Sequence, residues 1–163
     1  MILAEKSNRD LFYQRCLRNG IRWISISRHL PYLQVGKNHP LADRQAVTLA
    51  DLAPYTRAAM AQDEMETTFY SSHVKGYDPK FVEKRIVIND KSTMYALLTN
   101  TDSYYIGIDL SNVKGNNHDI CYIPIQDLKD PFELAFIHLN SHALTSAEKE
   151  LLEDIRSLAS TSR

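Results

Sequence analysis

The chain has 163 residues, of which 44% are hydrophobic and 24% charged, and this balance excludes a disordered or low-complexity protein. Its 19 basic and 20 acidic residues give a formal charge of -1. The chain therefore lacks the basic excess that is typical of a domain that binds nucleic acid by itself. Two cysteines are too few for a disulfide framework or a cysteine-rich zinc site.

The sequence also lacks the segments that are typical of membrane-spanning and secreted proteins. No apolar run approaches the roughly 20 residues that a helix needs to cross a bilayer. The N-terminal segment MILAEKSNRD is charged by its fifth residue and contains no apolar core of a signal peptide. We therefore expect a cytoplasmic protein with no membrane partner.

The N-terminal third predicts one helix and several short strands. After the apolar run 2–4, Ser7 is a good helix start, and Asn19 with Gly20 ends that helix. Thr48 can cap a later helical turn. The other predicted elements are strands at 21–27 and 31–35, a polar turn at 36–42 and the helical turn at 48–52.

Strands and helices alternate in the middle of the chain. The run 85–89 is apolar, as is typical of a buried parallel strand, and Asp90 to Ser92 can start the next helix. The alternation favours parallel strands joined by helical crossovers. The predicted elements are strands at 55–61, 85–89 and 104–108, a helix at 64–73 capped by Asp63, and a helix that carries Met94, Leu97 and Leu98.

Two strands and an amphipathic helix are predicted at the C-terminal end. The strands are 120–125 and 132–139, and the closing helix begins within 144–148. Leu151, Leu152, Ile155 and Leu158 have the spacing of a helix with one apolar side. The predicted fold class is therefore α/β.

The sequence contains no motif that predicts catalysis, a cofactor or a metal. The six histidines show no HExxH spacing, and we interpret them as surface and strand-end residues. Cys16 and Cys121 lie within apolar patterns and are interpreted as small buried side chains. We therefore expect a protein that is not an enzyme and that has no cofactor and no metal. The histidines stand at positions 29, 39, 73, 118, 138 and 142.

Polar residues at strand-to-helix junctions are the best candidates for a binding site. In α/β sheets, ligands bind at the carboxyl ends of parallel strands, where helix N-termini present free N–H groups that suit an anion. Ordinary helix capping explains the same residues equally well. Three junctions have this character: Asn89, Asp90, Ser92 and Thr93 after the strand 85–89, Gln62 after the strand 55–61, and Ser7 after the run 2–4.

Four segments, in order along the chain, resemble the effector-binding domain of LysR-type transcriptional regulators. The first is YLQVGKNHPLA at 32–42, followed by VTLADL at 47–52. The segment IVINDKSTM at 86–94 and the ending AFIHL with LTS at 135–146 are also similar. The segment at 86–94 resembles the branch of the family that is common in Gram-positive bacteria. HPLA alone would be a weak signal, but the ordered set is fairly specific.

The resemblance implies a type II periplasmic-binding-protein-like fold in which two α/β lobes close on a small molecule. It assigns 1–38 to part of the first lobe and the crossover, 39–115 to the second lobe, and 116–163 to return strands and a closing helix. The family's N-terminal helix-turn-helix is absent, so the chain resembles an N-terminally truncated regulator. The family contacts DNA only through that missing part.

Two functions follow as hypotheses. The first is the effector-sensing domain of a LysR-type regulator, with an anionic metabolite as a plausible effector and a homo-oligomer as the expected assembly. The second is a free-standing small-molecule-binding or amino-acid-binding α/β domain without a DNA partner. The coding sequence upstream of this chain would distinguish them.

Overall fold

The computed structural model describes residues 2–61, 84–109, 111 and 119–160. The chain divides into two compact units, which are considered separately. Unit 1 combines Met1–Leu30 with Asp130–Arg163, and unit 2 is Pro31–Lys129. The helix predicted at 64–73 lies outside the described residues, as do Gln62, His73 and His118.

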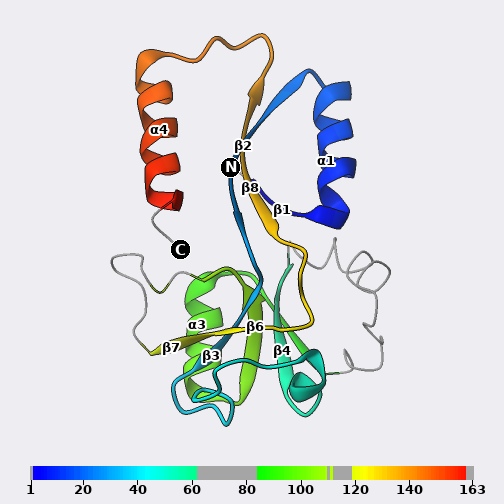
Figure 1. Cartoon of the computed structure of the whole chain (residues 1–163), viewed down its shortest axis with the longest axis vertical. Helices are drawn as coiled ribbons and strands as arrows, with labels where there is room; N and C mark the ends of the chain where they lie inside the picture. Colours follow the sequence, from blue (N-terminus) through cyan, green and yellow to red (C-terminus); the bar gives the residue numbers. More distant parts are fainter. Residues whose placement is uncertain (1, 62–83, 110, 112–118, 161–163) are drawn as a thin grey trace. The chain divides into compact units, whose positions relative to one another are not determined.

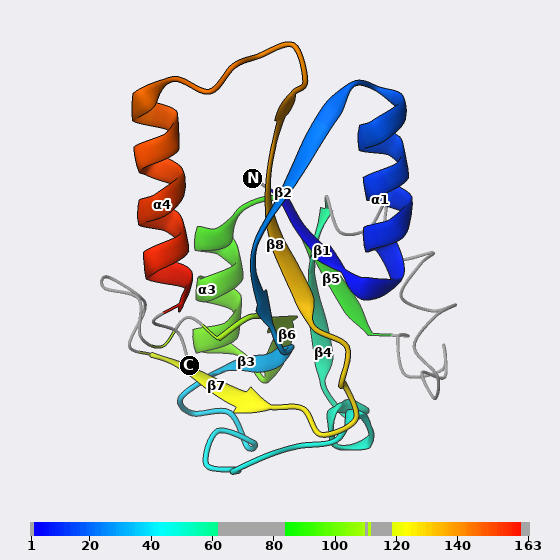
Figure 2. The same cartoon turned by 45° about the horizontal axis from the view of Figure 1, so that its top comes forward.

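Unit 1 is an antiparallel sheet of three described strands with two helices (Figure 1). Strand β8 lies between β1 and β2 and pairs with both. Helices α1 and α4 lie on either side of these strands in both views (Figures 1 and 2). The elements are β1 (Ile2–Glu5), α1 (Lys6–Arg18), β2 (Ile21–His29), β8 (Phe132–Leu139) and α4 (Ser146–Ser160).

The local signals of unit 1 predicted its elements closely. Helix α1 ends where Asn19 and Gly20 were expected to stop it, and Gly20 adopts φ 65°, the left-handed conformation that favours glycine. The strand predicted at 132–139 has the same bounds in the structure. Cys16 is buried, as predicted, whereas Cys121 of unit 2 is only partly buried, and both cysteines are free.

Helix α4 has the predicted one-sided apolar spacing, but only part of its apolar side is buried. Leu152 is buried, but Leu151 and Leu158 are 55% and 73% exposed. A helix advances about 100° per residue, so Leu151 and Leu158 point in nearly the same direction and Leu152 lies at the edge of the apolar side. Helix α4 packs against β2, which leaves the part of this side with Leu151 and Leu158 exposed.

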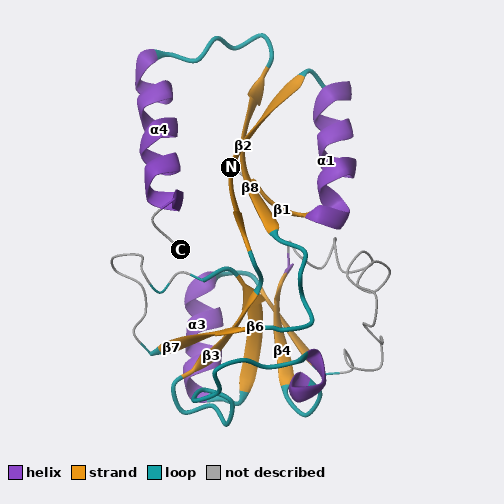
Figure 3. Ribbon diagram, viewed as in Figure 1, coloured by secondary structure: helices purple, strands orange, loops and turns teal. Residues whose placement is uncertain are grey.

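Unit 2 is a mixed five-stranded sheet with α3 on one face (Figure 3). The strand order is β5-β4-β6-β3-β7. Strand β4 is parallel to β5 and to β6, which confirms the predicted parallel pairing, whereas β3 is antiparallel to β6 and β7. The elements are β3 (Tyr32–Gly36), the 3-10 helix η1 (Leu49–Leu52), β4 (Thr56–Met60), β5 (Arg85–Ile88), α3 (Lys91–Asn100), β6 (Ser103–Gly107) and β7 (Ile120–Pro124).

The prediction that 85–89 is a buried strand is wrong, although the strand itself exists. Among the described strands, β5 lies at the end of the sheet order and pairs with β4 alone. Ile86 and Val87 are 40% and 45% exposed, and Ile88 is the only buried residue of the strand. An apolar run indicates a strand, but its position within the sheet decides how much of the strand is covered.

The core of unit 2 consists of two clusters on opposite faces of its sheet. Leu33 and Val35 point into one cluster, which also contains residues of η1, β6 and β7. Gly36, one position further along β3, faces α3, because successive side chains of a strand alternate between faces. Met94 and Leu98 of α3 belong to the second cluster, with Ala58, Met60, Ile88 and Ile120.

Candidate functional site

The carboxyl ends of the three parallel strands of unit 2 meet at one edge of the sheet. Met60 pairs with Ile88 at the ends of β4 and β5, and β6 runs in the same direction. Tyr32, the first residue of antiparallel β3, pairs with both Gly107 and Pro124 and so reaches the same edge. We call this the strand-end edge; it consists of Tyr32, Ala61, Asn89, Ile108 and Pro124 together with the β5–α3 junction.

The β5–α3 junction brings together four of the predicted site residues, Asn89, Asp90, Ser92 and Thr93. Asp90 is the N-cap of α3. Its Oδ1 atom accepts a hydrogen bond of 2.8 Å from the Thr93 backbone N–H, and its Oδ2 atom accepts one of 2.7 Å from the Thr93 hydroxyl. The capping interpretation therefore accounts for both polar groups of Thr93.

Asp90 places a carboxylate at the start of α3, next to the exposed Lys91 at the first position of the helix. The Thr93 hydroxyl, followed by the Thr93 and Ser92 backbone N–H groups, holds the pKa of Asp90 below its usual range. The carboxylate is therefore ionised at neutral pH and occupies the positive end of the helix dipole. The carboxylate can accept a hydrogen bond from a hydroxyl or amine group.

Gln34 is a buried polar residue that the sequence interpretation did not single out. It lies in the middle of β3, is only 3% exposed, and donates a 3.0 Å hydrogen bond from Nε2 to the carbonyl oxygen of Ile108. The contact joins β3 to the chain that leaves the end of β6. A lone glutamine within the apolar strand YLQV was the signal available in the sequence.

The other two predicted site residues are Ser7 and Gln62. Ser7 belongs to α1 of unit 1, and Gln62 lies outside the described residues. The convergence of three polar junctions on one site therefore remains a prediction, and the β5–α3 junction is the part that can be described.

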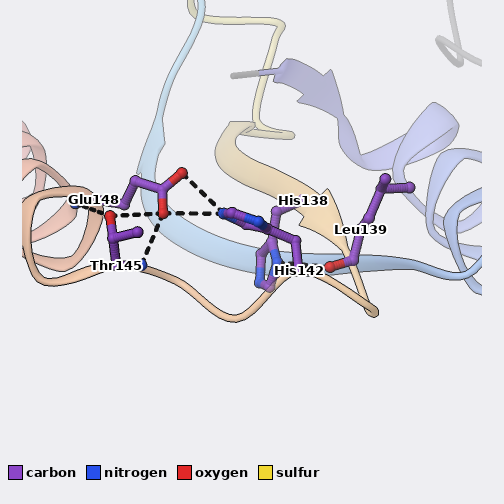
Figure 4. Close-up of polar contacts among 5 residues, drawn as sticks. All are labelled: His138, Leu139, His142, Thr145 and Glu148. Atoms are coloured by element: carbon purple, nitrogen blue, oxygen red, sulfur yellow. Dashed lines mark hydrogen bonds and ion pairs between the residues drawn. The ribbon is translucent and has the colours of Figure 1, made fainter.

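A second polar cluster lies in unit 1, at the start of α4 (Figure 4). The carboxylate of Glu148 accepts hydrogen bonds from the Thr145 backbone N–H at 2.8 Å, the Thr145 hydroxyl at 2.9 Å and the His142 Nε2 atom at 2.9 Å. The Thr145 N–H and the His142 ring lower the pKa of Glu148 to about 2. This is a capping box reinforced by a histidine, so its role is to start the helix.

The fold brings two histidines together that the sequence interpretation treated as scattered. The rings of His138 and His142 are 6.3 Å apart between centroids and lie edge to face (Figure 4). His138 Nδ1 donates a 2.9 Å hydrogen bond to the carbonyl oxygen of Leu139. Among the residues that the structure describes, no group of three or more histidine, cysteine or acidic side chains could hold a metal ion.

No helix in the described ranges combines the length and the apolar character that crossing a bilayer requires.

The sequence matches no family model, and no curated protein is detectably similar to it. Solved structures do match. The effector-binding domain of QuiR in complex with shikimate is 17% identical, with a TM-score of 0.59 over 87% of this chain. The BenM effector-binding domain with its effector benzoate is 16% identical, with a TM-score of 0.58 over 87%. HinK, a LysR family transcriptional regulator from Pseudomonas aeruginosa, is 12% identical, with a TM-score of 0.62 over 86%.

This chain spans 66% and 64% of the QuiR and BenM structures and 48% of the HinK structure. The matches extend over most of the residues of the chain. They confirm the α/β, periplasmic-binding-protein-like fold that the sequence predicted.

Proposed function

We propose that this chain, which has the fold of LysR effector-binding domains, is the small-molecule-sensing part of a LysR-type transcriptional regulator. The observation that carries the proposal is the agreement of 86–87% of the chain with two effector-binding domains and one LysR family regulator. Two of those structures hold small organic molecules in their own effector-binding domains. On this proposal the chain binds a ligand and does not catalyse a reaction.

The strand-end edge of unit 2 is the proposed binding surface. Asn89, Ser92 and Thr93 gather there on one junction, and their side chains are exposed at positions 92 and 93. The ionised Asp90 at the start of α3 favours a ligand that offers it a hydroxyl or amine hydrogen. This ligand class differs from the anionic metabolite that a free helix N-terminus would favour.

The remaining partners follow from the regulator proposal. A helix-turn-helix elsewhere in a longer protein would contact DNA. That regulator would be a cytoplasmic protein and would act as a homo-oligomer. The lobe boundaries at 38/39 and 115/116 stay a prediction about that protein. A free-standing binding domain without a DNA partner is the alternative, and the upstream coding sequence distinguishes the two.

Thermal unfolding in the presence of matched compounds tests the proposed ligand class. Shikimate carries hydroxyls and a carboxylate, benzoate carries only a carboxylate, and a polyhydroxylated amine carries no acid. A ligand at about 100 times its dissociation constant adds about 2.7 kcal/mol to the free energy of unfolding. We expect the hydroxylated compounds to raise the melting temperature more than benzoate does.

Variants of the β5–α3 junction test the proposed site. For any compound that binds, Asp90→Asn and Ser92→Ala should weaken the affinity by about 1–3 kcal/mol, because ligand groups lose their partners. Lys149→Ala, on the exposed side of α4 in unit 1, is the control. Affinities that are unchanged by both junction variants would exclude this edge as the site.

A further inference from the structure

His39 is the buried histidine of the turn that follows β3. Its side chain is almost entirely enclosed, with only 5% of the residue exposed. The Nδ1 atom accepts a 3.1 Å hydrogen bond from the backbone N–H of Leu41. The Nε2 atom lies 3.2 Å from the backbone carbonyl oxygen of Asp102, 63 positions further along the chain.

These two contacts determine the protonation state of the His39 ring. A backbone N–H can only donate, so Nδ1 must carry a free electron pair. A carbonyl oxygen can only accept, so Nε2 must carry the hydrogen. The ring is therefore neutral in the folded protein, and a second proton on Nδ1 would point directly at the Leu41 N–H. The protonated ring cannot keep both contacts.

Among the described residues, an aromatic ring and the chain at Asp102 face the His39 ring. The Tyr55 ring packs against it, with centroids 4.5 Å apart and an interplanar angle of 54°. Burial lowers the pKa of His39, while the backbone oxygen and the charge of Asp102 oppose this shift. An unfolded chain with the ordinary pKa of about 6.5 then binds the proton at higher pH than the folded chain does. The stability that depends on the neutral ring is present above that pH and decreases as the pH falls.

The Asp102 contact lies at the C-terminal end of α3. This helix ends at Asn100 with Thr101 as its C-cap, and Thr101 bonds in turn to the hydroxyl of Ser103 at 2.9 Å. The last turn of α3 also packs closely on Gly36, at the start of the turn that holds His39. The other end of the same helix carries Asp90 and the junction proposed to bind ligand.

We propose that His39 is a positioning residue, a latch that holds the C-terminal end of α3 against the 36–42 turn while its ring is neutral and releases it when the ring is protonated. The consequence for ligand binding rests on the proposed function, since α3 is the helix that presents the strand-end edge. The latch itself does not depend on that function. Through the His39 ring, the stability of the contact at the C-terminal end of α3 depends on pH.

Amide hydrogen exchange of the 163-residue chain, without ligand, tests the latch. Exchange is followed by NMR between about pH 7.5 and 5, where an ordinary histidine takes up its proton. The rates are corrected for the pH dependence of exchange from an unprotected amide. We expect the protection of the Leu41 and Ser103 amides to fall about tenfold as the pH decreases. The Val35 amide, in the middle of the sheet, should keep its protection. A corrected profile for Leu41 and Ser103 that is flat would overturn the proposal.

Two variants separate the two contacts of His39. His39→Asn keeps an acceptor near the Nδ1 position but is too short to reach Asp102, so it should retain the protection of Leu41 and lose that of Ser103. His39→Gln places a donor near the Nε2 position and should give the opposite result. In neither variant should the protection of these amides depend on pH. The control His142→Asn should show the same pH dependence as the wild type.

A pH-dependent profile that persists in His39→Asn and His39→Gln would assign the effect to another group and contradict the latch. If both variants fail to fold, the wild-type profile compared with His142→Asn still decides the question. Because no ligand is added, failure of the ligand search would leave this result unaffected.

Discussion

Gly36 in β3 and Leu98 in α3 are packed backbone to backbone. A Cβ atom at position 36 would overlap the carbonyl oxygen of Leu98 and lie 3.0 Å from the Cα atom of Thr99. Backbone atoms of a helix cannot move aside as a flexible side chain can. The absence of a side chain at position 36 therefore allows α3 to approach the sheet of unit 2.

Gly36→Ala should push α3 away from the sheet and destabilise unit 2. Overpacking of this kind costs about 1–3 kcal/mol, and urea unfolding followed by circular dichroism measures it. Gly20→Ala is the matched control, because nothing lies within 4 Å of a Cβ atom there, although φ is 65°. It should cost about 1 kcal/mol through backbone strain alone. Equal stability of Gly36→Ala and the wild type would contradict the close packing.

Removal of the α3 N-cap should destabilise the helix. Asp90→Ala loses both hydrogen bonds to Thr93, and we expect a loss of about 1 kcal/mol in the free energy of unfolding. Thr93→Val removes only the hydroxyl bond and should cost less. A larger loss in Thr93→Val than in Asp90→Ala, measured by urea unfolding, would show that Thr93 acts through other contacts.

The Glu148 cap should make the start of α4 sensitive to acid. Its pKa is lowered from 4.5 to about 2 in the folded chain, so the unfolded chain binds this proton more readily between those values. The stabilisation is present above about pH 4.5 and is lost as the pH falls toward 2. Glu148→Gln should remove this pH dependence from the free energy of unfolding. Glu150→Gln, an exposed position on the same helix, should keep it.

Gln34 should matter for stability even though it is polar and buried. Gln34→Leu fills a similar volume but leaves the Ile108 carbonyl oxygen without its donor. Loss of a buried partner costs about 1–3 kcal/mol, which thermal unfolding measures. Tyr95→Leu, on the half-buried side of α3, is a comparison that changes packing against the second core cluster and leaves the bond to Ile108 in place. An unchanged melting temperature of Gln34→Leu would show that water donates to the Ile108 carbonyl oxygen in place of the glutamine amide.

The elements that depend on neighbours a few residues away were predictable from the sequence. The stop at Gly20, the start of α3 at Asp90 and the strand 132–139 each follow from local signals. Caps, turns and strand periodicity act over one or two turns of chain, so one sequence is enough to recognise them.

Contacts between distant segments were decided by the tertiary structure. The sequence showed that His39 stands in a polar turn, but not that Asp102, 63 positions away, accepts a hydrogen bond from its ring. It showed an apolar run at 85–89, but not that β5 would lie at the end of the sheet order. It placed Asp90 and Thr93 at a helix start, with capping and ligand binding equally open. The structure shows the capping hydrogen bonds of Asp90 to Thr93. Contacts such as that of His39 with Asp102 could not be predicted, because strand order, register and side-chain burial depend on the whole of the packed unit.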